Sequence, residues 1–105
     1  MNGYQVSFFT VQDRMHGHQA MHEWLMQEAK SLGIRGSTVV FAAEGYSRSG
    51  GFHSVHFFEL ADQPVEVTLA MTVVQTEALF ARLEAEKVNL FYVKTPVEFG
   101  TVGAK

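Results

Sequence analysis

The sequence predicts an α+β fold in which two helices cover one face of an antiparallel sheet. Its 105 residues are 47% hydrophobic and 12% aromatic, which is enough apolar material for one core and too short a chain for two. Segments with a strand period of two and segments with helical spacing follow one another in the order βαββαβ. Two βαβ halves of similar length are typical of the ferredoxin-like sandwich, so we expect residues 1–105 to form one such domain.

The first half of the chain contains a strand, a helix and a second strand. Residues 4–11 mostly alternate apolar and polar side chains, as a half-buried strand does. After a polar turn over residues 12–17, apolar residues recur at helical spacing across residues 18–32, and Gly33 stands where a helix C-terminus favours positive φ. Residues 37–43 are rich in β-branched and aromatic side chains between two glycines, which predicts a second strand.

A glycine- and serine-rich segment over residues 44–53 interrupts the hairpin that follows. It contains three glycines and Arg48, and such a composition buries little apolar surface and costs conformational entropy to order. We therefore expect a long mobile loop after the second strand. Residues 54–60 have extended character and are expected to continue the hairpin on the other side of the loop.

The second half repeats the order of strand, helix and strand. Residues 65–73 alternate without interruption between apolar side chains and polar or small ones, which makes this the clearest strand in the chain. Thr76 is expected to cap a second helix that carries an apolar stripe. Residues 91–99 alternate again, and Pro96 within them favours an edge strand.

Aromatic residues predict that the second face of the sheet is also covered. The helices cover one face only, whereas rings are expected on the other face at Phe9, at Phe41, at Phe57 or Phe58, and at Tyr92. Large exposed apolar patches usually mark interfaces. We therefore expect copies of the chain to associate through this face; a monomer covered wholly by its helices is the alternative.

The composition excludes several classes of protein. With 8 Lys and Arg against 11 Asp and Glu, the formal net charge is −3, so the chain lacks the basic face that nucleic-acid binding requires. The absence of cysteine excludes disulfide scaffolds, thiolate nucleophiles and cysteine-ligated zinc. Apolar runs stay below the ~18 residues of a membrane span, and the N-terminus lacks a secretion signal. We expect a cytoplasmic protein with no nucleic-acid partner.

Few residues are candidates for chemistry. No nucleophile stands with a base and an orienting group in a recognisable motif, so we expect no enzymatic activity and no cofactor. His18 and His22, four residues apart on the predicted helix near His16, would suit a shared metal ion; solvated histidines are the simpler interpretation, and we predict no metal site. Arg48 among the glycines of residues 44–53 would suit a phosphate or carboxylate, with a plain flexible hairpin tip as the alternative.

Several blocks of residues resemble those of one known family. The blocks are Asp13–Gly17 (DRMHG), Ala29–Val39 (AKSLGIRGSTV) and Glu44–Tyr46 (EGY). They are similar to the DRYHG, AxxxGIxGxTV and EGFG blocks of the PII-like family catalogued as domain of unknown function 190. The resemblance covers most of the chain, from the first predicted strand to the last. The GIRGSTV part of the second block and the stretch Gly45–Arg48 (GYSR) are also similar to the PII nitrogen-regulatory signalling proteins.

The resemblance implies a function as well as a fold. It implies a non-enzymatic homotrimer that acts in signalling or regulation and binds a small ligand, such as an adenine nucleotide, in clefts between subunits. The positions that match this cleft are Thr38, Gly45 and Arg48, with Tyr46 beside them. It also implies that the loop over residues 44–53 reaches a partner protein, such as a membrane transporter or an enzyme.

Two departures from the family pattern narrow the expected ligand. Ser47 replaces the second glycine of the usual Gly-aromatic-Gly, and residues 84–89 lack the Gly- and Lys/Arg-rich phosphate-binding loop of the PII nitrogen-regulatory proteins. A mononucleotide or another small anion therefore fits better than a nucleoside triphosphate. The alternative class is that of CutA-like trimeric divalent-metal-binding proteins, which share the fold and would use the histidines.

Overall fold

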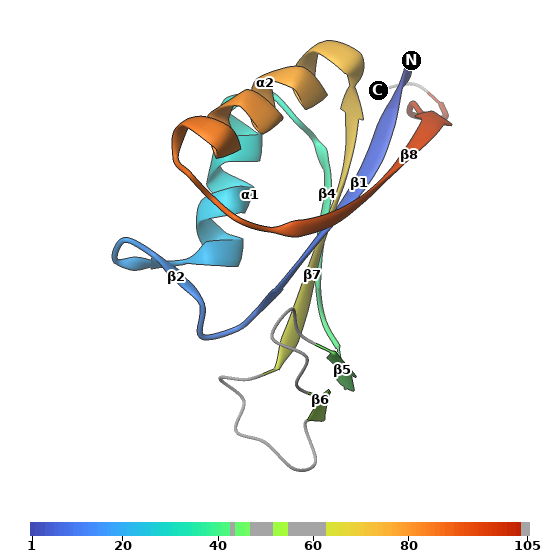
Figure 1. Ribbon diagram of the computed structural model, residues 1–105. Coiled ribbons are helices and arrows are strands. Elements are labelled where there is room, and N and C mark those ends of the chain that lie inside the picture. The colour runs from blue at the N-terminus through green and yellow to red at the C-terminus, as the bar shows by residue number, and fades with distance from the viewer. Residues whose placement is uncertain (43, 47–51, 55–62, 104–105) are drawn as a thin grey trace.

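The computed structural model describes residues 1–42, 44–46, 52–54 and 63–103. Its main sheet has four antiparallel strands in the order β4-β7-β1-β8. Helices α1 and α2 lie on the same face of this sheet (Figure 1). These elements span β1 (Asn2–Val11), α1 (Met21–Ser31), β4 (Gly36–Phe41), β7 (Pro64–Thr72), α2 (Val73–Ala85) and β8 (Phe91–Glu98). The arrangement is the predicted ferredoxin-like fold, with the Pro96-containing strand at an edge as expected.

The core lies between the two helices and the sheet face that they cover. The central strands β1 and β7 pair so that Val6 is opposite Leu69 and Phe8 is opposite Val67, and all four side chains are buried. Because successive side chains of a strand point to opposite faces, the residues between them lie on the other side, which we call the open face. The rest of the buried core consists of Met21, Trp24, Leu25, Ala29, Ile34, Val65, Met71, Leu79 and Leu83.

Capping residues determine where the helices begin and end. The cap predicted for α2 was wrong: Thr76 is buried inside the helix, where its hydroxyl donates to the Thr72 carbonyl at 2.8 Å. Thr72 is the N-cap, because its hydroxyl accepts the Gln75 N–H at 3.1 Å and the Gln75 side chain accepts the Thr72 N–H at 3.0 Å. After α1, Gly33 adopts φ +78° as predicted.

Within the described residues, no helix has the length and apolar character needed to cross a membrane.

Helix α1 is shorter at its start than the predicted helix over residues 18–32. A small hairpin of β2 (Met15–His16) and β3 (Gln19–Ala20) precedes it. The Met21 N–H donates to the Arg14 carbonyl at 2.8 Å, which closes the hairpin at the point where the helix begins. The prediction was wrong here because helical spacing of apolar side chains says nothing about a backbone hydrogen bond that turns the chain back.

The predicted loop over residues 44–53 begins and ends as a hairpin. Strand β5 (Glu44–Tyr46) pairs antiparallel with β6 (Phe52–Ser54), at the end of the sheet opposite to the two chain termini (Figure 1). The segment predicted as a loop therefore includes a short strand at each end, which composition did not reveal because backbone pairing needs no apolar pattern. Residues 47–51 and 55–62, which hold the loop centre and most of the predicted continuation, lie outside the described residues.

Two aromatic residues that were predicted on the open face lie on the helix-covered face. Tyr92 contacts Phe8 and Phe80, with ring centroids 6.3 Å and 4.9 Å away, and Phe41 contacts His22 of α1 at 5.6 Å. In β8 and β4, apolar residues stand at consecutive positions, so the alternation does not show which of them face the helices. Pairing with β1 and β7 therefore decides which side chains face the helices.

Candidate functional site

Three of the four residues predicted to bind a ligand lie on two consecutive strands, β4 and β5. Thr38 is on the edge strand β4, opposite Thr68 of β7, and its side chain is exposed on the open face. Gly45 and Tyr46 lie on β5, the next strand along the chain, and their backbone pairs with β6. Arg48 lies outside the described residues. Their joint role in ligand binding stays a prediction.

A chain of hydroxyl groups lies on the open face beside Thr38. The Thr68 hydroxyl donates to Glu66 Oε2 at 3.0 Å and lies 3.1 Å from Oγ of Ser7. Because the single hydroxyl proton of Thr68 goes to the carboxylate, Ser7 is the donor to Thr68. All three side chains are half-buried, and Glu66 is the charged group among the described side chains of this face. The centre of the open face is therefore polar, and the side chains of Ser7, Thr68 and Glu66 there form hydrogen bonds with one another.

Exposed apolar side chains lie beside this polar chain. Phe9 and Phe91 are opposite each other on β1 and β8, with ring centroids 5.7 Å apart, and are 37% and 54% exposed. Val40 and Val93 on the same face are also exposed. Phe9 lies where the sequence predicted, and Phe91 takes the place predicted for Tyr92. The other predicted rings, Phe57 and Phe58, lie outside the described residues. Such a patch is typical of an interface.

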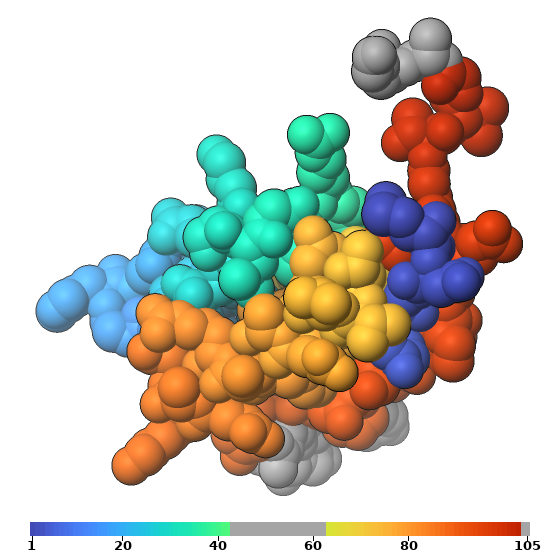
Figure 2. Space-filling view, turned by 90° about the horizontal axis from the view of Figure 1, so that it is seen from above, coloured from blue at the N-terminus to red at the C-terminus, as the bar shows by residue number. Residues whose placement is uncertain are grey.

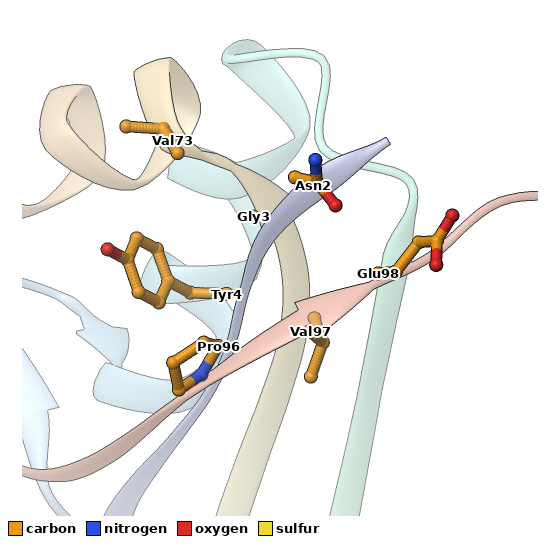
Figure 3. A pocket seen from close by; sticks show the side chains of 7 residues that line it. All are labelled: Asn2, Gly3, Tyr4, Val73, Pro96, Val97 and Glu98. Atoms are coloured by element: carbon orange, nitrogen blue, oxygen red, sulfur yellow. The ribbon is translucent and has the colours of Figure 1, made fainter.

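A shallow cavity of about 420 Å³ lies at the opposite end of the sheet from β5. Figure 2 shows the N-terminal residues in blue between the start of α2 in gold and β8 in red. In Figure 3, Tyr4 lies between Val73 of α2 and Pro96 of β8. Sequence reasoning missed this cavity because no motif marks it and both ends of the chain form it. Its lining residues are Asn2, Gly3, Tyr4, Val73, Pro96, Val97 and Glu98.

Lys94 places a positive charge next to this cavity. Its Nζ lies 4.5 Å from the ring centroid of Tyr4, which lines the cavity, and 5.8 Å from that of Phe80. Both distances are in the range of cation–π interactions. The cavity therefore combines apolar walls with a nearby cation, and Thr38 is not among its lining residues.

The end of α2 carries an arginine that is engaged by carboxylates. Arg82 Nε donates to Glu28 Oε1 at 2.7 Å, and Arg82 Nη1 lies 3.3 Å from Glu86 Oε2. The hydrogen bond and the charge of Glu28, together with the charge of Glu86, raise the pKa of Arg82 above its ordinary value. The guanidinium thus stays charged, and its charge is balanced by Glu28 and Glu86. It lies next to residues 84–89, which lack a Gly- and Lys/Arg-rich phosphate-binding loop.

Three of the five histidines, His16, His18 and His22, have described side chains, and they do not converge as three metal ligands would. His18 lies in the turn before α1, because the helix begins only at Met21, so the predicted four-residue spacing on one helix was wrong. His22 is in α1 and buried against the Phe41 ring, and His16 contacts Glu86 at the C-cap of α2. Across the described parts of the chain, no three histidine or acidic side chains converge as metal ligands would.

Comparison with solved structures identifies the fold as PII-like. CPII from Thiomonas intermedia K12, a nitrogen regulatory PII-like protein bound to ADP, AMP and bicarbonate, is 14% identical over 96% of this chain and 91% of its own, with a TM-score of 0.69. The same protein bound to ADP and bicarbonate has a TM-score of 0.67 at the same identity and coverage. A protein from Thermus thermophilus described as PII-like and signalling is 16% identical over 92% of this chain and 88% of its own, with a TM-score of 0.66.

The family model for domain of unknown function 190, described as Uncharacterized ACR, COG1993, matches residues 3–98. The chain therefore belongs to this family, as its sequence blocks predicted. Among curated proteins, none matches the chain at a significant level.

Proposed function

We propose that this protein is a non-enzymatic regulator of the PII type, which binds a small ligand between subunits and presents residues 44–53 to a partner protein. The observation that carries the proposal is the likeness of its fold to CPII, which was solved with ADP, AMP and bicarbonate bound. Membership of the PII-like family over residues 3–98 supports it. The fold alone does not determine a site, so the ligand is argued from this chain's own residues.

The proposed assembly is a homotrimer in which the open faces contact one another. The exposure of Phe9 and Phe91 supports it, because obligate interfaces are apolar at their centre. The polar groups of this face also suit burial, since Ser7, Thr68 and Glu66 already form hydrogen bonds with one another. Clefts for a ligand would then form where neighbouring subunits meet.

An adenine mononucleotide or another small anion, such as bicarbonate, is the proposed ligand. The Thr38 hydroxyl is exposed on β4, and Gly45, Tyr46 and Arg48 would complete the site on the segment that follows. The engagement of Arg82 by carboxylates supports a ligand with fewer phosphate groups than ATP.

Binding alone is the proposed mode of action. A ligand that favours one conformation of residues 44–53 changes the surface that this segment presents to a partner, for which we propose a membrane transporter or an enzyme. We place the protein in the cytoplasm, where adenine nucleotides are available.

Isothermal titration calorimetry with AMP, ADP, ATP and bicarbonate tests the proposal. Arg48→Ala should weaken binding of the responding ligand by about 1.5 to 3 kcal/mol, the scale of a hydrogen bond to a charged group. Arg48→Lys should recover part of this loss, because an ammonium lacks the planar fork of arginine. Thr38→Val should also weaken binding, whereas Thr101→Val, which alters an exposed threonine near the C-terminus outside the sheet, is the control. Unchanged affinity in Arg48→Ala would remove that residue from the site.

Thermal-shift measurements distinguish this proposal from the metal-binding alternative. Stabilisation by a nucleotide or by bicarbonate is the expected result, because a ligand that binds only the folded state raises the melting temperature. Stabilisation by Zn(II) or Cu(II) alone, lost in His18→Ala, would overturn the proposal in favour of a divalent-metal-binding protein.

A further inference from the structure

The two edge strands of the main sheet have outer backbone groups with which no described segment pairs. Strands β4 and β8 lie at opposite edges of this sheet (Figure 1). In antiparallel strands, pairs that exchange both hydrogen bonds alternate with pairs that exchange none, so every second residue of an edge strand turns its N–H and C=O outward. Such an edge readily pairs with another strand.

The outward residues of β4 follow from its pairing with β7. The Ala42 N–H donates to the Pro64 carbonyl at 2.8 Å. In the register of the two strands, Val39 and Phe41 therefore fall between the bonded positions and turn their N–H and C=O outward. The outward residue before them is Ser37, whose N–H already donates to the carbonyl two residues earlier at 3.1 Å. The free donors of this edge are thus those of Val39 and Phe41.

The outward residues of β8 follow in the same way from its pairing with β1. Met1 and Phe99 donate to each other's carbonyl at 2.8 Å. In the register of these strands, Tyr92 and Lys94 therefore turn their N–H and C=O outward. The next outward residue is Pro96, which has no N–H to donate. The run of free donors on β8 is thus interrupted at Pro96, as the run on β4 is at its own end.

The outer edges of β4 and β8 match in one antiparallel register between two copies of the chain. In it, Phe41 lies opposite the partner subunit's Tyr92. Val39 lies opposite the partner subunit's Lys94, and each of these pairs can exchange both hydrogen bonds. The two positions without a free donor then fall opposite each other, whereas a shift by two residues would set one of them against a residue with a free donor. The opposed pairs are Phe41–Tyr92, Val40–Val93, Val39–Lys94, Thr38–Thr95 and Ser37–Pro96, the second residue of each being the partner subunit's.

The side chains also match in this register. Phe41 and Tyr92 are 46% and 44% exposed and would pair ring against ring on the helix-covered face. Val40 and Val93, each 48% exposed, would meet on the open face. Aromatic and β-branched pairs of this kind stabilise antiparallel strands. Strand β4 has no charged residue, and the Lys94 ammonium is engaged by two rings of its own subunit, 4.5 Å and 5.8 Å from their centroids.

We propose that β4 of each subunit pairs with β8 of the next subunit, so that the sheets join edge to edge; this inference rests on the proposed homotrimer and specifies its contact. Strands β4 and β8 run in opposite directions, so the antiparallel order continues from one subunit into the next. Because the two edges differ, the contact is head to tail, and it closes into a ring of three when successive copies are rotated by a third of a turn. The contact also places Thr38, a proposed ligand-binding residue, directly beside the partner subunit.

A pair of introduced cysteines tests the contact, because the chain has no cysteine of its own. Val40 and the partner subunit's Val93 fall between the hydrogen-bonded pairs, where opposite Cα atoms are about 4.5 Å apart, a separation that a disulfide can span. Within one chain the two positions are on opposite edges of the sheet. Oxidation of full-length protein with Val40→Cys and Val93→Cys should therefore give covalent dimers and trimers on non-reducing electrophoresis, with the trimer as the largest product.

The single variants Val40→Cys and Val93→Cys are the controls for this experiment, and both should remain uncrosslinked. Dimers in Val40→Cys alone would overturn the proposal in favour of two β4 edges that pair with each other. A lack of crosslinks in the double variant would also overturn it. Products longer than a trimer would contradict the closed ring.

A proline substitution provides a second measurement. Val39→Pro removes an outward N–H and none of the hydrogen bonds to β7, so the dissociation constant of the oligomer should rise about tenfold, the scale of one lost hydrogen bond with a partner carbonyl left unpaired. Glu98→Pro removes an outward N–H of β8 beyond the proposed contact and is the matched control. Sedimentation velocity measures both variants, and circular dichroism checks the fold. A trimer unweakened by Val39→Pro would overturn the edge contact and leave the proposed homotrimer standing, whereas a monomeric wild type would overturn both.

Discussion

The two faces of β7 carry opposite kinds of side chain. On the helix-covered face, Val65, Val67, Leu69 and Met71 are at most 1% exposed. On the open face, Glu66, Thr68, Ala70 and Thr72 are only half-buried. Because side chains alternate along a strand, β7 buries one row of side chains in the core and leaves the other row available for the proposed association. Folding stability and self-association should therefore respond to different substitutions on the same strand.

The largest effect on folding is expected from the helix-covered face. Leu69→Ala removes a fully buried side chain and should lower the free energy of unfolding by about 3 kcal/mol, since a cavity remains. The adjacent Thr68→Ala, on the open face, should cost only about 1 kcal/mol, the scale of one hydrogen bond. Urea denaturation at one protein concentration measures both. Equal losses would contradict the division between the two faces.

The open face should instead control association. Phe9→Ser and Phe91→Ser should each weaken self-association by about 2 kcal/mol, the scale of an interface hot spot, because each removes an exposed aromatic ring. Sedimentation velocity over a range of concentrations measures this effect, and circular dichroism checks that the fold is retained. Val102→Ser, at a fully exposed position near the C-terminus, is the control. A stable oligomer in a variant that carries both Phe9→Ser and Phe91→Ser would mean that the subunits associate through another surface.

Thr72 at the end of β7 sharpens the comparison, because it lies on the open-face side but supports the fold. Its hydroxyl caps α2, so Thr72→Ala should lower the free energy of unfolding by about 1 kcal/mol and leave self-association unchanged. Thr95→Ala alters an exposed threonine that caps no helix and should change stability by less than about 0.5 kcal/mol. Thermal or urea unfolding of the two variants distinguishes them, and similar losses would refute the capping role.

The smallest effect is expected at Glu66. Burying a carboxylate at an interface costs desolvation energy, and Glu66 is the charged group among the described side chains of the open face. Glu66→Gln keeps an acceptor for the Thr68 hydroxyl and removes the charge, so association should tighten by about twofold to fivefold. Sedimentation of wild type and variant measures the change. Weaker association in Glu66→Gln would indicate a cationic partner across the interface.

The local sequence pattern was enough to predict an element where one face of that element is apolar and the other is polar or small. The alternation of residues 65–73 predicted β7 to within one residue at each end, and Gly33 correctly marked the end of α1. The ferredoxin-like order of elements followed from the order in which segments with a strand period of two and segments with helical spacing occur along the chain. The same reasoning failed for Phe41 and Tyr92, because their strands carry apolar side chains at consecutive positions and either face would fit.

The candidate site was predicted by resemblance rather than by pattern. Thr38 lies on the strand expected for it, whereas Gly45 lies on β5, within the segment that was expected to be a loop. Nothing in the spacing of these residues alone would mark a ligand site. The cavity beside Tyr4 carries no sequence signal, because its walls come from β1, α2 and β8.

The sequence by itself determined the order of the elements, the buried face of β7 and the family, because these depend on neighbouring residues and short blocks. Only the tertiary structure decided that α2 begins at Val73, directly after the N-cap Thr72, where the pairing of β7 with β1 ends. It likewise decided that His16 meets Glu86, 70 residues away along the chain. The physical reason is that register and ion pairing depend on which segments pack together, and that is a property of the whole chain rather than of any window within it.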